Sequence, residues 1–176
     1  AITRTTTPRQ PPADETLTFG KVFSDHMFMM EYHDGQGWHD PRVVPYQNFT
    51  MDPACCVLHY GQAIFDGLKA FRGADGNVRL FRANDHAARL NRSAHYLCIP
   101  ELPVDIVAES FRALVEIDQN WVPKKAGTSM YIRPTVIATE TFLGVHPSHS
   151  YLYYVIAGPV GAYYKEGMNP VKILAS

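Results

Sequence analysis

Four glycines interrupt the apolar segment 59–82, and this spacing sets the main limit on how the first half of the chain can fold. Glycine weakens the interior of a helix or strand and favours turns, so one continuous helix is disfavoured there. Apolar residues at helical spacing before Gly67 predict a helix that ends at this glycine. The runs 68–72 and 78–82 then predict a hairpin, because an Asp-Gly pair between them supplies the positive φ values of a tight turn.

Two amphipathic segments, 86–97 and 104–118, predict helices because their apolar residues recur every three or four positions. Asn84 or Asp85 precedes the first segment and is suited to cap it. Pro103 precedes the second and is suited to the first helical position. We therefore expect two amphipathic helices in the middle of the chain.

Strands are predicted where β-branched and aromatic residues gather, at 26–46, 128–139 and 150–160. The first of these contains a glycine turn and predicts a hairpin of its own. Another apolar strand begins in the final residues, 169–176. A strand at the end of a domain needs a cover, so either Ser176 is a natural end or the chain is the front part of a longer protein.

The composition is that of a folded, water-soluble protein, with 46% hydrophobic and 19% charged residues. The net charge of -1 gives no general attraction to nucleic acid or to anionic membranes. No uninterrupted apolar run is long enough to span a bilayer, and the first 20 residues lack the apolar core of a secretory signal. We therefore expect a cytoplasmic protein, with a mobile arm rich in Thr, Pro and charge at 1–16.

Several large enzyme classes are disfavoured, because the chain has no P-loop, G-x-G-x-x-G, G-x-S-x-G or H-E-x-x-H sequence. His146 and His149 have a spacing that could share a metal ion, but two ligands in a Pro- and Ser-containing loop favour a surface loop without metal. The cysteines Cys55, Cys56 and Cys98 have no paired spacing, which favours free thiols over a disulfide or zinc framework.

Five residues carry the candidate binding chemistry. Arg89 and Arg92 lie one turn apart on a predicted helix that follows Arg82, and an arginine fork matches a phosphate group. From spacing alone, a solvated and salt-bridged helix face explains them better. Arg133 lies among apolar strand residues, with Tyr131 on the same face, and such a cation needs a partner or a wet face.

Several motifs in register resemble the N-terminal half of branched-chain amino acid aminotransferases, which are fold-type IV enzymes dependent on pyridoxal 5′-phosphate. They are FGKVFSDHMFMMEY, HYGQAIFDGLKAFRG, VRLFRANDHAARLNRSA, SMYIRPT, TFLGV and GPVGAYYKEG. The resemblance implies a small α/β domain of the α+β type at 17–157, with a mixed or antiparallel sheet and flanking helices. It implies that 158–176 forms a connection and the first strand of a larger domain.

The resemblance also implies a reaction. Family members exchange an amino group between leucine, isoleucine or valine and 2-oxoglutarate, giving branched-chain 2-oxo acids and glutamate, and the cofactor serves as the electron sink. A homodimer is expected, without nucleic acid or membrane as a partner. The alternatives are a D-amino acid aminotransferase or an aminodeoxychorismate lyase of the same fold type, or a noncatalytic domain that binds small anions or a partner.

The resemblance assigns roles residue by residue. Arg89 matches the arginine that binds the cofactor phosphate. The substrate pocket is matched by helix residues Tyr60 and Phe65, by Phe19 and Tyr163, by the pair Tyr131 and Arg133, and by Val145. The arginine of the pair meets the second carboxylate of glutamate or 2-oxoglutarate, and the valine reaches the neighbouring subunit.

No residue of this chain is expected to be the catalytic lysine. The Schiff-base lysine of the family lies beyond the position that matches Ser176, in a glycine-rich stretch. None of the six lysines present, Lys21, Lys69, Lys124, Lys125, Lys165 and Lys172, lies in that context. The resemblance therefore implies that these 176 residues are inactive on their own.

Overall fold

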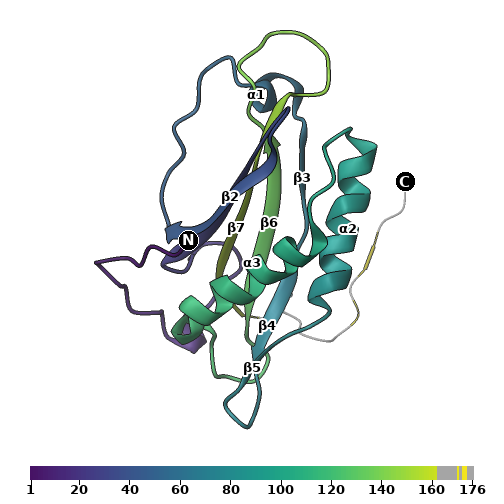
Figure 1. The fold of residues 1–176 in the computed structure, drawn as a ribbon. Helices are drawn as coiled ribbons and strands as arrows, with labels where there is room; N and C mark the ends of the chain where they lie inside the picture. The colour runs from purple at the N-terminus through teal and green to yellow at the C-terminus, as the bar shows by residue number, and fades with distance from the viewer. Residues whose placement is uncertain (162–169, 171, 174–176) are drawn as a thin grey trace.

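The computed structural model describes residues 1–161, 170, 172 and 173. Its centre is one seven-stranded sheet with two helices packed across one face (Figure 1). The strands are β1 (His26–His33), β2 (Gly37–Pro45), β3 (Ala63–Phe65), β4 (Leu68–Arg72), β5 (Val78–Leu80), β6 (Ser129–Ala138) and β7 (Ser150–Val160). The helices are α1 (Cys56–Tyr60), α2 (Ala83–Tyr96) and α3 (Val104–Ile117), with 3₁₀ turns at Asp14–Thr16 and Gln119–Trp121.

The strand order is β2-β1-β7-β6-β4-β5, and β3 also pairs with β6. All pairings between the described strands are antiparallel. The expected α+β class, with an antiparallel sheet and flanking helices, is confirmed. β6 and β7 form the middle of the sheet and pair along the whole of β6, where β-branched and aromatic side chains fit a pleated surface.

The main core lies between the sheet and the helices α2 and α3. Leu90 of α2 and Phe111 and Leu114 of α3 have no exposed surface, and they belong to one buried cluster with Ile132 and Val136 of β6. Burying an aliphatic or aromatic side chain of this size contributes about 1.5–3 kcal/mol each. This face of the sheet therefore supplies most of the packing that holds the fold.

The opposite face of the sheet is covered less completely in the described part of the chain. A smaller cluster of Met27, Met29, Ile137 and Leu152 packs there against partly buried side chains that include Phe49. Beside this cluster, the side chains of β6 that point away from the helices are only half buried. This second face carries Tyr131 and Arg133, two of the residues to which the sequence assigned pocket roles.

The predicted helix ending at Gly67 was wrong. α1 ends at Tyr60, because Gly61 adopts the left-handed conformation (φ 63°) and its N–H donates to the carbonyl of Val57. The next apolar residues join β3, so Phe65 is a strand residue and not a helix residue. A long-range partner decided this, since the free edge of β6 pairs with residues that have helical spacing in the sequence.

The predicted caps were also wrong. α2 begins after Arg82, which has a positive φ of 56° and makes no side-chain cap, so Asn84 and Asp85 lie inside the first turn. Pro103 precedes the first helical residue of α3 and takes the N-cap position. The helices themselves, the 68–72 strand and both long strands are confirmed.

The N-terminal residues make contacts that the expected mobile arm would lack. The backbone N–H of Thr3 donates to the carbonyl of Val43 at 2.9 Å, and Arg9 Nε donates to Asp25 Oδ1 at 2.9 Å. Asp14 Oδ2 accepts the N–H groups of residues 124 and 125. The mobility of 1–16 stays a prediction, but in this structure the segment lies against the domain.

The other expected boundaries are tested little by the described residues. β7 continues to Val160, so residues 158–160, which the sequence placed in a connection, lie in the sheet. Of the expected strand at 169–176, residues 169, 171 and 174–176 lie outside the described residues, so this expectation is not tested. Of the helices that the structure describes, none has the length and apolar character needed to cross a bilayer.

Candidate functional site

The candidate site forms where the edge of β6 changes partner. β3 pairs with one half of this edge and β4 with the other, and Asp66 and Gly67 lie in the break between them. The N–H of Asp66 donates to the carbonyl of Pro134 at 3.0 Å. Proline has no N–H to donate and is normally excluded from a central strand. Pro134 is accommodated in β6 because the backbone opposite it, at the break, does not continue the regular hydrogen-bond ladder.

Four side chains gather on the half-covered face beside this break. The guanidinium carbon of Arg133 lies 4.5 Å from the ring centroid of Phe65 and 5.2 Å from that of Tyr131. Arg133 Nε and Nη2 donate to the hydroxyl of Tyr131 at 3.2 and 2.9 Å. The ring of Phe19 lies 4.9 Å from that of Tyr131. The structure thus brings together Phe19, Phe65, Tyr131 and Arg133 of the predicted pocket residues.

Arg133 is a cation without a paired anion in the described part of the chain. No carboxylate among those residues lies within ion-pair distance of it, although the structure contains many other arginine–carboxylate pairs. Its contacts are aromatic faces and a phenol, which stabilise a cation less than a carboxylate does. The group is therefore held in place and still able to accept an anionic ligand.

A cavity of about 390 Å³ opens at this cluster. Its lining is mainly apolar, from Phe19, Gly20, Val22, Phe23, Tyr131, Arg133, Ile156, Ala157, Gly158 and Val160. A largely apolar cavity with a few convergent polar groups is typical of a small-molecule site. Arg133 and the hydroxyl of Tyr131 are the polar groups here.

At two glycines of this site, neighbouring atoms lie too close to the backbone to leave room for a side chain. A Cβ on Gly67 would lie 2.0 Å from the hydroxyl oxygen of Tyr131. A Cβ on Gly158 would lie 2.0 Å from the carbonyl oxygen of Val22. Gly67 is therefore required by the position of the tyrosine and does not end a helix.

Arg89 reaches the same break from α2. Its Nε donates to Asp66 Oδ2 at 2.8 Å, its Nη2 donates to Asp66 Oδ1, and Nη2 also lies 3.3 Å from the carbonyl oxygen of Gly67. Burial alone would raise the pKa of Asp66, whose side chain is 4% exposed, but the hydrogen bonds from Arg89 and from the Gly67 N–H outweigh it and lower this pKa. The carboxylate is thus ionised at neutral pH and fixes one edge of the guanidinium.

Asp66 is the residue that the sequence analysis missed. Its partner Arg89 is 23 residues away in the chain, so no local pattern joins them. The available signal was an acidic residue set between apolar Phe65 and Gly67. The other two arginines of the group differ, since Arg82 pairs with the exposed Asp85 at 2.7 Å and Arg92 is exposed on α2.

The remaining predicted pocket residues lie away from the cluster or outside the described residues. Tyr60 ends α1 and is 44% exposed, and its ring contact within the described chain is with His59. Val145 is 91% exposed in the loop between β6 and β7. Tyr163 lies outside the described residues.

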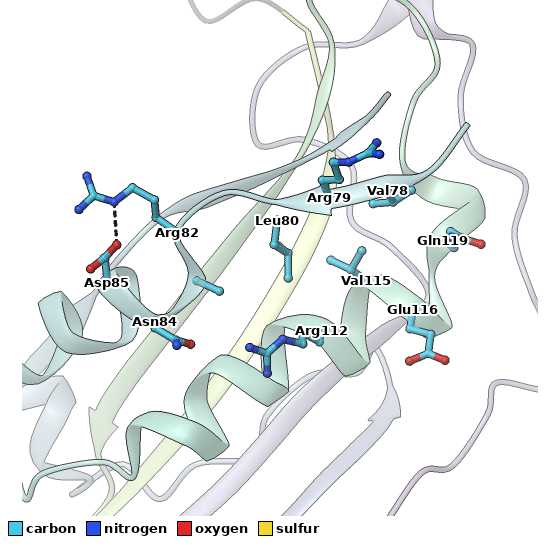
Figure 2. Close-up of a pocket in the computed structure, with 11 residues that line it drawn as sticks. Val78, Arg79, Leu80, Arg82, Asn84, Asp85, Arg112, Val115, Glu116 and Gln119 are labelled. Carbon is cyan, nitrogen blue, oxygen red and sulfur yellow. Dashed lines mark hydrogen bonds and ion pairs between the residues drawn. The ribbon is translucent and has the colours of Figure 1, made fainter. Parts of the chain in front are cut away.

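A larger hollow of about 720 Å³ lies elsewhere, between β5 and the helices (Figure 2). Leu80 and Val115 line it, and each of its three arginines pairs with a carboxylate nearby in the chain. Arg82 pairs with Asp85 and Arg112 with Glu109, both on the exposed surface. Its arginines are thus already paired, so the smaller cavity, where Arg133 has no carboxylate partner among the described residues, is the better candidate.

Comparison with known proteins gives a consistent result. No protein-family model matches the chain. It is 52% identical over 169 residues to branched-chain-amino-acid aminotransferase 2 of Bacillus subtilis, which covers 96% of this chain and 47% of that protein. It is 47% identical over 169 residues to the mitochondrial branched-chain-amino-acid aminotransferase of Bos taurus, covering 95% and 43%. The chain matches the N-terminal part of branched-chain amino acid aminotransferases.

Solved branched-chain aminotransferases have the same fold. The Escherichia coli enzyme superposes with a TM-score of 0.61 at 24% identity, covering 79% of this chain and 41% of that one. The T.th. enzyme, solved with pyridoxamine 5′-phosphate, gives 0.57 at 27% identity, covering 78% and 41%. The chain spans a little under half the length of the branched-chain aminotransferases that it matches.

Proposed function

We propose that a protein containing this chain transfers the amino group between branched-chain L-amino acids (leucine, isoleucine and valine) and 2-oxoglutarate, giving branched-chain 2-oxo acids and glutamate. The observation that carries the proposal is Arg133, a cation between the rings of Phe65 and Tyr131 with no carboxylate partner in the described chain. The match to branched-chain aminotransferases supports it.

A shared pocket for leucine and glutamate has two conflicting needs. Leucine needs apolar walls, which the rings of Phe19, Phe65 and Tyr131 supply. Glutamate brings a second carboxylate, which is costly to bury without a partner. Arg133 can pair with this carboxylate. The free-energy cost of placing its own charge here is small, because the tyrosine hydroxyl and two aromatic faces already contact the guanidinium. The same wall therefore serves both kinds of substrate.

We assign pyridoxal 5′-phosphate as the cofactor, which when bound supplies the electron sink for this reaction. Arg89 fits its phosphate in part. Asp66 holds the Nε and Nη2 edge, whereas Nη1 has no hydrogen bond to any described residue and 53% of the side chain is exposed. Because Asp66 balances its charge, Arg89 would act as a directed donor, and further donors must come from outside this part of the protein.

The other assignments rest on the resemblance. Tyr60 and Tyr163 would complete the pocket wall, and Val145, which is 91% exposed, would contact the second subunit of a homodimer. The catalytic lysine is proposed to lie outside this chain, so these residues alone would be inactive. We also propose a cytoplasmic location for the protein.

The proposal is tested by measuring the substrate preference of the Arg133→Ala variant of the complete protein. The kcat/KM for glutamate and 2-oxoglutarate should fall about ten- to a hundredfold, because a hydrogen bond to a charged group contributes about 1.5–3 kcal/mol. The kcat/KM for leucine should change far less. The control is Arg79→Ala, because Arg79 pairs with Asp75 on the exposed β4–β5 hairpin and should leave both unchanged. An equal loss for leucine and glutamate would remove the assigned role.

A further inference from the structure

Three potential metal-binding side chains converge in the loop between β6 and β7, far from the site described above. Glu140, His146 and His149 each offer one ligand atom, and these atoms lie within 4.8 Å of one another. The loop extends beyond the end of the sheet next to α1, at the top of Figure 1. In the sequence only the two histidines suggested a metal, because the glutamate lies six residues before the first of them.

The hydrogen bond of His146 directs one ring nitrogen toward this cluster. Its Nδ1 lies 2.8 Å from the carbonyl oxygen of Pro147, which can only accept a hydrogen bond. The proton of the neutral ring therefore sits on Nδ1, and Nε2 carries the lone pair. This Nε2 lies 3.9 Å from Glu140 Oε1, facing a second potential ligand.

His149 is oriented in the same way by a carboxylate from another part of the fold. Its Nδ1 lies 2.5 Å from Asp34 Oδ2, in the turn between β1 and β2. The carboxylate accepts the Nδ1 proton, so Nε2 of the neutral ring is available. A carboxylate behind the ring is the usual partner of a metal-binding histidine, because it fixes the ring and raises its basicity.

Glu140 is held at both its backbone and its carboxylate. Its carbonyl oxygen accepts the N–H of Cys56 at 2.8 Å, which ties it to the start of α1. Its Oε2 accepts the N–H of His149 at 2.8 Å, which leaves Oε1 toward His146. In each of the three side chains one polar atom is thus occupied by a fixed contact, which leaves Oε1 of Glu140 and Nε2 of each histidine available to a shared ion.

We propose that Glu140, His146 and His149 bind a divalent transition metal ion, with Zn²⁺ the best match. Two imidazoles and a carboxylate suit zinc better than Mg²⁺ or Ca²⁺, which prefer oxygen ligands alone. Tetrahedral zinc with bonds of about 2.0–2.2 Å needs ligand atoms about 3.4 Å apart. The side chains are 22%, 30% and 62% exposed, so they have room to close from the observed spacing. A water molecule would complete the fourth position.

The test is a zinc titration of the purified, tag-free protein after metal removal, followed by calorimetry and by the visible absorption of Co²⁺ in the same site. One saturable binding event should be lost in His146→Ala and in His149→Ala. It should weaken about ten- to a hundredfold in Asp34→Asn, because loss of the carboxylate behind a histidine ligand typically has that effect. Without zinc, each variant should give the unfolding curve of the wild type, which separates loss of the site from loss of the fold.

The matched control is the exposed pair His33 and His39, whose ring nitrogens lie 2.9 Å apart at the neighbouring hairpin. The double variant His33→Ala/His39→Ala should bind zinc like the wild type. Loss of the event in this variant, or its retention in His146→Ala and His149→Ala, would overturn the proposal. So would the absence of any saturable zinc binding by the wild type.

Discussion

The two faces of the sheet differ in how completely their side chains are used for packing. The helix-covered face contains residues with no exposed surface, such as Met130 and Ile132, packed in one cluster with Phe111 of α3. On the opposite face Phe65 is 64% exposed, and Arg133 has no carboxylate partner among the described residues. The first face holds the fold together, and the second leaves groups free to bind a ligand.

A single strand serves both faces. Along β6, Met130, Ile132 and Val136 point to the helices, and Tyr131 and Arg133 point to the other side. This follows from the two-residue period of a strand, which sends alternate side chains in opposite directions. Stability and binding are therefore separable by mutation, although the residues are neighbours in the chain.

The largest expected effect tests this separation with two matched phenylalanines. Phe111→Ala should lower the free energy of unfolding by about 3–5 kcal/mol, because it leaves a cavity in a filled core. Phe65→Ala should change it by less than about 1 kcal/mol, since most of that ring is already exposed. The same Phe65→Ala change should lower kcat/KM for leucine by about tenfold, through loss of a pocket wall. Denaturant unfolding and steady-state kinetics measure the two effects.

The comparison would fail if the two alanine variants lost similar stability. In that case the exposed face would be a second structural core and not a binding surface. Retained stability together with unchanged leucine kinetics in Phe65→Ala would instead place the substrate elsewhere.

A smaller effect is expected at the cofactor. Arg89→Ala should raise the dissociation constant of pyridoxal 5′-phosphate about ten- to a hundredfold, because it removes a charge-assisted donor contributing about 1.5–3 kcal/mol. Asp66→Asn should have a weaker effect in the same direction, since it leaves the arginine present but less firmly oriented. Equilibrium dialysis of the protein against the cofactor measures both. Unchanged retention in Arg89→Ala would exclude Arg89 from the phosphate site.

The spacing of apolar residues correctly predicted the helices and strands whose secondary structure does not depend on a distant partner. The amphipathic pattern around Leu90 and Phe111 gave both long helices, and the β-branched runs gave β6 and β7. The prediction of a helix through Phe65 was wrong, because this segment pairs with the edge of β6 as a strand although its apolar residues have helical spacing. Nothing in the segment itself marks that competition, since the partner strand comes some 70 residues later, as Phe65↔Thr135 shows.

Four of the residues that the resemblance assigns to the pocket lie together in the structure, but their arrangement was not predicted and their roles stay predictions. The resemblance named Arg133 and Tyr131, and the strand period placed them on one face, yet the contact with Phe65 depends on pairing between β3 and β6. The position of Asp66 beside Phe65 was a local sign, but its pairing could not be predicted, because it depends on Arg89 reaching from a helix to the break in the sheet. Long-range contacts of this kind carry no local signal.

The most direct test of the binding face is a crystal structure of the complete protein with cofactor and 2-oxoglutarate. We expect the distal carboxylate of the ligand to lie within hydrogen-bond distance of the Arg133 guanidinium, with its carbon chain along the rings of Phe65 and Tyr131. A ligand whose distal carboxylate is bound by other residues, with Arg133 still held only by Tyr131, would contradict it.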